Sequence, residues 1–190
     1  MDKDTRIIIV APRFYKILRL SQVIAHAAVI SGIDVKTAEF TNEPLMTREI
    51  IHIKLGQKIH SPLISKNEAN VVICFEPYLS IDIVEYYLSR EGIIFLNSQP
   101  FLGDKNSFNE ISAYFKNITS VTHEFNFLEF SREEGFDTLR INFSVLGMLI
   151  GKKCLPLSKG SILMAIEEIV PSDELSIYKN ALNFGMKIST

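Results

Sequence analysis

Short, strongly apolar runs separated by longer amphipathic stretches dominate the first two thirds of the chain. Segments 7–10, 70–75 and 92–96 have the length and apolar character typical of strands buried on both faces of a parallel sheet. The apolar spacing over 17–30 predicts a helix, and Ser31-Gly32 signals its end. Strands that alternate with helices in this way predict an α/β fold with a mostly parallel sheet.

An antiparallel hairpin is expected after the second strand, which is predicted over 34–40. The stretches 48–55 and 58–61 flank Gly56-Gln57, and a glycine at the first position of a two-residue loop suits a type II′ turn. We therefore predict that these two stretches pair with each other and add an antiparallel hairpin to the mainly parallel sheet.

Beyond the last of the apolar runs the pattern becomes helical. A helix is expected near 109–117 and one more strand near 120–125, after which apolar positions recur with helical spacing. The sheet is thus predicted to lie mainly within 5–126, with a helical part over 127–190 packed on it. With 190 residues, 47% of them apolar, the chain can bury one core, so we expect a single α/β domain over 1–190.

Charge and hydropathy exclude several classes of partner. The net charge is −2 and the pI is about 6.1, which leaves no basic surface for nucleic acid. No apolar run approaches the roughly 18 residues that a membrane-spanning helix needs. The first six residues are mostly charged or polar, unlike the start of a signal peptide. We expect a cytoplasmic protein with no nucleic-acid or membrane partner.

Cysteine and histidine positions predict no metal site. Cys74 and Cys154 are far apart and no CxxC pair occurs, so the ligand spacing of an iron–sulfur cluster or a structural zinc is missing. Across the predicted hairpin, His52 and His60 would point to opposite faces of the sheet. The other two histidines are isolated from these and from each other in the sequence.

The junction after the first strand is unusual for this fold class. Nucleotide-binding folds place glycines there, because backbone amides at the helix N-terminus must approach a phosphate. Segment 11–16 has no glycine, Pro12 lacks an amide donor, and the bulky side chains after it would occupy the space of a pyrophosphate. The sequence therefore argues against a dinucleotide site and against an NAD-dependent dehydrogenase.

Five residues near the predicted strand ends are candidates for ligand binding. Arg13, Tyr15 and Lys16 crowd the start of the first helix and could clamp a carboxylate or phosphate with side chains instead of amides. Glu76 and Asn97 follow neighbouring strands, so they are expected at the same edge of the sheet. Alternatively, the two basic residues are surface charges, and the aromatic side chains at this junction pack under a partner chain.

Several segments occur in a characteristic order. They are 32–39, 61–64, 69–72 with Glu76-Pro77, 92–97 with Pro100, Asn142 and Gly147, 155–158 with Ala165-Ile166, and Asn180-Ala181 with Gly185. No single segment is specific for a protein family, but the order in which they follow one another is. In this succession the chain resembles the gamma-type subunit of 2-oxoacid:ferredoxin oxidoreductases of the pyruvate/ketoisovalerate oxidoreductase family, which is also the small subunit of indolepyruvate oxidoreductase.

The resemblance implies a three-layer, Rossmann-like α/β domain in a multi-subunit enzyme that decarboxylates a 2-oxoacid, makes an acyl-coenzyme A and reduces ferredoxin. It implies that thiamine diphosphate and iron–sulfur clusters reside on partner subunits, with no catalytic residue and no cofactor in this chain, which would help to accommodate coenzyme A. Two glycine-rich loops of the family would fall at 11–16 and 44–47, and both sets of glycines are missing.

Two alternatives remain open at this point. The chain could act alone on a small anion held by Arg13, Lys16 and the strand-end loops. It could also be a structural homodimer without catalysis, in which Phe14 and Tyr15 fill the crevice at the strand ends.

Overall fold

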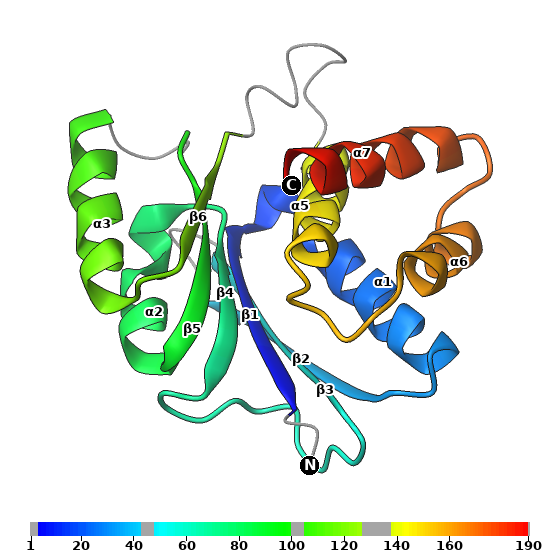
Figure 1. The fold of residues 1–190 in the computed structure, drawn as a ribbon, viewed down its shortest axis with the longest axis horizontal. Coiled ribbons are helices and arrows are strands. Elements are labelled where there is room, and N and C mark those ends of the chain that lie inside the picture. The colour runs from blue at the N-terminus through cyan, green and yellow to red at the C-terminus, as the bar shows by residue number, and fades with distance from the viewer. Residues whose placement is uncertain (1–3, 43–47, 100–104, 127–137, 190) are drawn as a thin grey trace.

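A six-stranded mixed sheet forms the centre of the protein (Figure 1). The computed structural model describes residues 4–42, 48–99, 105–126 and 138–189. The strand order is β2-β3-β1-β4-β5-β6. The strands are β1 (Thr5–Pro12), β2 (Asp34–Asn42), β3 (Arg48–Gly56), β4 (Ala69–Cys74), β5 (Leu88–Asn97) and β6 (Thr122–Phe125).

The parallel half of the sheet confirms the strands expected from the apolar runs. β1 pairs with β4 from Ile7↔Val71 to Val10↔Cys74, and residues 7–11 are completely buried. β4 and β5 are parallel, as are β5 and β6. These runs are apolar throughout because each strand is covered on both faces.

Antiparallel pairing is present, but the predicted location of the hairpin was wrong. β2 and β3 pair from Asp34↔Gly56 to Asn42↔Arg48, and β3 also pairs antiparallel with β1. Because both edges of β3 are thereby occupied, 58–61 cannot pair with it, and no strand lies between β3 and β4. The Ile59 amide instead donates to Asp34 Oδ2 at 2.7 Å. Because the predicted hairpin does not form, the argument that placed His52 and His60 on its opposite faces is also wrong.

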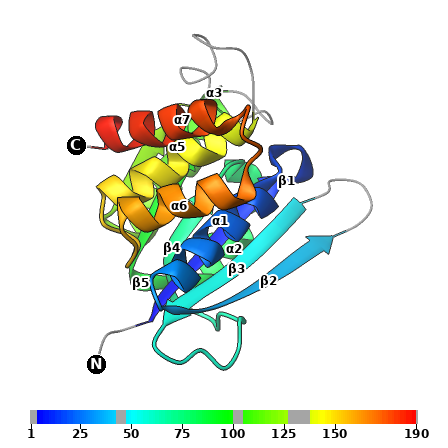
Figure 2. The same ribbon diagram turned by 90° about the vertical axis from the view of Figure 1, so that its right-hand side faces the viewer.

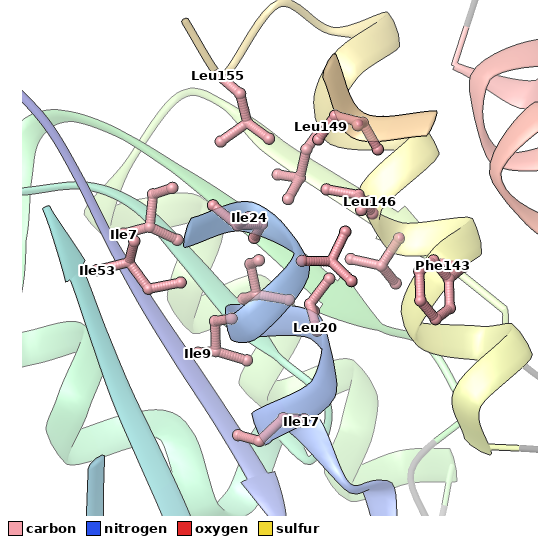
Figure 3. Close-up of a cluster of buried hydrophobic side chains, with 14 of the residues drawn as sticks. Ile7, Ile9, Ile17, Leu20, Ile24, Ile53, Phe143, Leu146, Leu149 and Leu155 are labelled. Atoms are coloured by element: carbon pink, nitrogen blue, oxygen red, sulfur yellow. The ribbon is translucent and has the colours of Figure 1, made fainter. Parts of the chain in front are cut away.

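Four helices cover one face of the sheet, three of them from the C-terminal third (Figures 1 and 2). Alternate side chains of β1 and β3 point to this face, where Ile7, Ile9 and Ile53 meet the helices (Figure 3). Leu20 and Leu146 are among their partners. The helices are α1 (Ile17–Ile30), α5 (Thr138–Gly151), α6 (Lys159–Ile169) and α7 (Leu175–Ile188).

Glycines bring α5 and α7 into direct backbone contact. A Cβ atom on Gly185 would lie 1.8 Å from the carbonyl oxygen of Ser144, and one on Gly147 would lie 2.1 Å from that of Leu182. Both glycines belong to the segments that carry the family resemblance. The close packing of these two helices therefore depends on two positions without side chains.

The opposite face carries α2 (Ile81–Tyr87) and α3 (Lys105–Ile118), so the protein has the expected three layers (Figure 1). Ile8 and Val10 of β1 point to this face and pack with Val72 and Cys74 of β4. None of the helices in the described segments is long and apolar enough to cross a membrane.

His52 of β3 is buried beneath the segment that connects β3 to β4. Its Nδ1 accepts a hydrogen bond from the Ile64 amide at 3.2 Å, and its ring lies 5.1 Å from those of both Phe40 and Tyr87. Burial, reinforced by the charge of Lys54, lowers the pKa of His52 to about 4. The imidazole is therefore neutral in the folded protein at neutral pH.

This burial predicts a pH dependence of stability. Between the ordinary pKa of 6.5 and the folded value of about 4, the unfolded chain binds more protons than the folded chain. The stabilising contribution is complete above pH 6.5 and decreases as the pH falls toward 4, by about 3 kcal/mol in total. Urea unfolding across this range should show a flatter pH dependence for His52→Gln than for the wild type. The matched control His60→Gln, at an exposed position, should keep the wild-type slope, and equal slopes for all three proteins would refute the assignment.

Candidate functional site

The carboxyl ends of three parallel strands meet at one edge of the sheet. β1 leads into the short 3₁₀ helix η1 (Arg13–Tyr15) and then α1, while β4 leads through Phe75 and Glu76 into η2 (Pro77–Ser80). β5 ends at Asn97, one residue after Leu96, which pairs with Cys74 at the end of β4. This is the edge at which α/β folds usually hold their ligands. The structure therefore places all five predicted residues on segments that start or end here.

Three of the five, Tyr15, Glu76 and Asn97, meet around Phe75 in the interior. The Tyr15 ring lies 5.0 Å from the Phe75 ring, and its hydroxyl is 3.5 Å from Glu76 Oε1. Asn97 Nδ2 donates to the Phe75 carbonyl at 3.0 Å. Glu76 and Asn97 are completely buried, and Tyr15 is 2% exposed. These side chains hold three strand ends together and are shielded from solvent.

Tyr15 fills the space that a phosphate loop would leave open. Phe14 stacks on its outer side at 4.7 Å, with Phe75 on the inner side. Burial, followed by the charge of Glu76, raises the pKa of Tyr15 far above its usual value, so the hydroxyl stays protonated and donates toward the carboxylate. This agrees with the expectation that bulky side chains close the junction after β1.

Asn142 of α5 is an important residue that the analysis of local pattern did not single out. Its Nδ2 donates to the carbonyls of Tyr15 at 2.8 Å and Lys16 at 3.4 Å. Lys16 has a φ of 53°, in the left-handed region where glycine is favoured. The available signal was its place among the segments that carry the family resemblance, and the structure shows that its side chain is completely buried. Asn142 thus supports a lysine in a backbone conformation that the family's glycine turn would adopt more easily.

The two basic candidates lie on the outside of this edge. Arg13 has a side chain 67% exposed, and its Nε lies 3.7 Å from Oε1 of Glu49, which is opposite Ala11 on β3. Glu49 is buried, and its Oε2 has no hydrogen-bond partner among the described residues. Burial, followed by repulsion from Glu39, raises the pKa of Glu49, although Arg13 opposes the shift. Sequence reasoning missed this carboxylate, which lies near the start of β3.

The candidate residues therefore divide into two groups. Tyr15, Glu76 and Asn97 contact one another or Phe75 in the interior, whereas Arg13 and Lys16 have exposed side chains. Because Arg13 already faces a carboxylate of its own chain, an anion would have to compete with Glu49 for it. Ligand binding by these five residues stays a prediction.

The described residues show no metal centre or activated thiol. No group of three or more His, Cys, Asp or Glu side chains within them is placed to hold a metal ion. Cys74 is completely buried, and burial raises its thiol pKa to about 12. Burial likewise raises the pKa of Cys154. Since the thiolate is the reactive and metal-binding form, neither cysteine has the environment of a nucleophile or a ligand.

Two surface hollows lie away from the strand-end edge. One, of about 470 Å³, runs along α1 and is lined by Gln22, Ala25, His26, Val29 and Ile169. The other, of about 260 Å³, lies near the start of β1 and the end of β3, between Thr5, Gly56 and Pro156. Neither includes any of the five candidate residues.

Two comparisons with known protein sequences agree with this architecture. The family model described as "Pyruvate ferredoxin/flavodoxin oxidoreductase" matches residues 17–187. Indolepyruvate oxidoreductase subunit IorB of Archaeoglobus fulgidus is 25% identical over 177 residues, which cover 88% of this chain and 87% of that protein.

Solved structures share the fold at low sequence identity. The gamma subunit of keto/oxoacid ferredoxin oxidoreductase from Geobacter sulfurreducens superposes with a TM-score of 0.72 at 14% identity, over 98% of this chain and 97% of that one. Subunit PORC of pyruvate oxidoreductase from Thermotoga maritima gives 0.64 at 16% identity, with the same coverage. The 2-oxoglutarate:ferredoxin oxidoreductase of Magnetococcus marinus, solved with 2-oxoglutarate, coenzyme A and succinyl-CoA, gives 0.73 at 13% identity, over 100% of this chain and 31% of that one. The chain therefore belongs to the pyruvate ferredoxin/flavodoxin oxidoreductase family and has the fold of its gamma-type subunits.

Proposed function

We propose that this protein is the gamma-type subunit of a 2-oxoacid:ferredoxin oxidoreductase complex and that it supports the coenzyme A-dependent oxidative decarboxylation of a 2-oxoacid. The family match over 17–187 carries the proposal. The Magnetococcus enzyme supports it, because that enzyme was solved with a 2-oxoacid and coenzyme A, and the present chain corresponds to 31% of the length of the matched chain. A chain of this size would be one part of a larger catalytic assembly.

The residues of this chain do not fit the cofactors of such an enzyme. An iron–sulfur cluster of the common type needs four cysteine thiolates, whereas the sequence has two cysteines, and Cys74 is buried with a raised thiol pKa. At the strand-end edge, Tyr15 occupies the space where a diphosphate would approach the backbone. We therefore assign thiamine diphosphate and the clusters to partner subunits and no catalytic residue to this chain.

The contribution of this chain to coenzyme A binding stays open within the proposal. Segment 11–16 lacks the family's glycines, and η1 is closed by its own aromatic side chains, so we assign no coenzyme A contact to it. The second glycine-poor loop, 44–47, lies outside the described residues. No specific observation favours a stand-alone anion-binding domain, because Arg13 is paired with Glu49. The cytoplasmic location expected from the sequence also stays a prediction.

Affinity purification of the tagged full-length chain from its own cells tests the assembly. We expect partner chains that carry thiamine diphosphate and iron–sulfur clusters to co-purify with it and to be identified by native mass spectrometry. The recovered complex should reduce a viologen dye when supplied with a 2-oxoacid and coenzyme A. Testing pyruvate, 2-oxoglutarate, indolepyruvate and a branched-chain 2-oxoacid in parallel would identify the substrate.

A matched preparation from cells that lack this chain provides the control. We expect the partner chains from these cells to show little coenzyme A-dependent activity and to regain it when the purified chain is added. Recovery of the chain without any thiamine- or cluster-bearing companion would contradict the proposal, as would full activity of a complex from which the chain is missing.

A further inference from the structure

The edge strand β2 is a long, regular strand with one unused side. Within the described residues it pairs only with β3, through nine consecutive residue pairs without a bulge, and it contains no proline. Among residues 34–41, none is fully buried, and Lys36, Glu39 and Phe40 are exposed. Figure 2 faces this strand and shows no helix across its outer edge in the described part of the chain. Such an edge presents unpaired backbone groups that can accept another strand.

The sequence of β2 is suited to antiparallel pairing with a second copy of itself. A two-fold axis that passes through Ala38 perpendicular to the sheet pairs the whole strand, from Asp34 opposite Asn42 of the second copy onward. Residues directly opposite each other share a face of the sheet. Lys36 would then face Phe40 of the second copy, an arrangement that permits a cation–π contact. No like charges would be opposite each other.

Neighbouring registers fit less well. Residues directly opposite each other must point to the same face of the sheet. The two-fold axis must therefore pass through a residue of β2 and cannot pass between two residues. An axis through Glu39 would place two glutamates directly opposite each other, which is destabilising. An axis through Thr37 would leave Thr41 and Asn42 unpaired and would place the aspartate at position 34 opposite an aromatic ring. Pairing about Ala38 uses the full strand and avoids both defects.

Helix α1 lies on the same side of the molecule as β2 (Figure 2), and it carries an exposed apolar stripe. Leu18 and Val29 are 42% and 63% exposed, and Ala25 lies between them in the hollow of about 470 Å³. Since α1 packs directly on β2, the two-fold axis would bring the α1 stripes of the two copies toward each other. Burial of these side chains would supply the apolar area that an edge ladder alone lacks.

We propose that two copies of this chain associate along β2, with Ala38 at the two-fold axis, and join their six-stranded sheets into one continuous sheet. The proposal goes beyond the assignment to the oxidoreductase family and does not depend on it. Its occupant is a second copy of this chain because the strand can pair with itself over its whole length in a register that places no like charges directly opposite each other.

Cysteine cross-linking of the full-length chain tests the register. In a Cys154→Ser background, Ala38→Cys should form an intermolecular disulfide under mild oxidation, because directly opposed residues are within disulfide range. Lys36→Cys and Phe40→Cys should each cross-link poorly alone, since each would be about 13 Å from its own counterpart along the strands. An equimolar mixture of these two variants should cross-link well. Equal cross-linking of all single variants would overturn the proposed register.

Light scattering measures the association itself. The wild-type chain should have twice the monomer mass at roughly 50 μM, in the range where modest interfaces are occupied. Val29→Asp should shift it toward the monomer while circular dichroism remains unchanged, because Val29 is exposed. The control Val121→Asp, at a position 37% exposed beside the opposite edge strand β6, should leave the mass unchanged. A monomeric wild type, or an Ala38→Cys variant that forms no intermolecular disulfide, would overturn the proposal.

Discussion

Replacement of Gly185 by valine is expected to lower the free energy of unfolding by about 3 kcal/mol, because the added carbons would overlap backbone atoms that cannot move aside alone. The first added carbon would lie 1.8 Å from the Ser144 carbonyl oxygen and 2.7 Å from its carbon. These atoms belong to the backbone of α5, so relief requires α5 and α7 to separate. That separation would loosen the layer that carries Asn142 and therefore the support of η1.

Urea unfolding followed by circular dichroism measures the effect, and Gly160→Ala provides the matched control. Gly160 is also helical, but a Cβ atom there has only Ser158 Oγ nearby, at 3.6 Å. Alanine is the better helix former by up to about 1 kcal/mol, so this variant should be slightly more stable than the wild type. If Gly185→Val unfolded at the wild-type urea concentration, the close approach of α5 and α7 would be refuted.

The second large effect is expected for Tyr15→Ala, with a loss of about 3–5 kcal/mol, the range for removal of a buried aromatic side chain. The change would leave a cavity beside Phe75 and remove the hydroxyl from the buried Glu76 carboxylate. Tyr15→Phe keeps the ring and should cost roughly 1 kcal/mol through the lost hydrogen bond alone. The pair of variants separates the contribution of packing from that of the hydroxyl.

Phe14→Ala is the natural control for this measurement. Phe14 is adjacent in sequence and stacks on Tyr15, but it is 45% exposed, so its removal should cost far less than that of Tyr15. Similar losses at the two positions would show that Tyr15 is not the side chain that closes the strand-end crevice. The same variants can be added to the reconstituted complex, where activity would report whether a closed η1 is needed for assembly.

The replacement of a glycine turn by a closed aromatic loop depends on several contacts. Lys16 adopts a left-handed backbone conformation, which costs a residue with a side chain of order 1 kcal/mol or more. The hydrogen bonds from Asn142 to the carbonyls of residues 15 and 16 and the burial of the Tyr15 ring offset this cost. In this chain the strand-end edge is thus stabilised by its own side chains.

Local patterns were sufficient for much of the fold. The apolar runs became β1, β4 and β5, because a strand covered on both faces must be apolar throughout. The helix expected over 17–30 ends where Ser31-Gly32 predicted, with Gly32 at a φ of 69° that a side chain would disfavour. The closed junction after β1 was also predictable, because 11–16 contains no glycine and its last four side chains are bulky.

The sequence by itself thus determined which segments are buried, where α1 ends and that the junction after β1 is closed. Only the tertiary structure decided that β3 lies between β1 and β2, that Glu49 faces Arg13, and that Asn142 holds a loop 127 residues away. Burial and turn formation are set by neighbouring residues and leave a periodic signal. Strand order and the partners of buried polar groups depend on how distant segments pack together, and no local pattern encodes that choice.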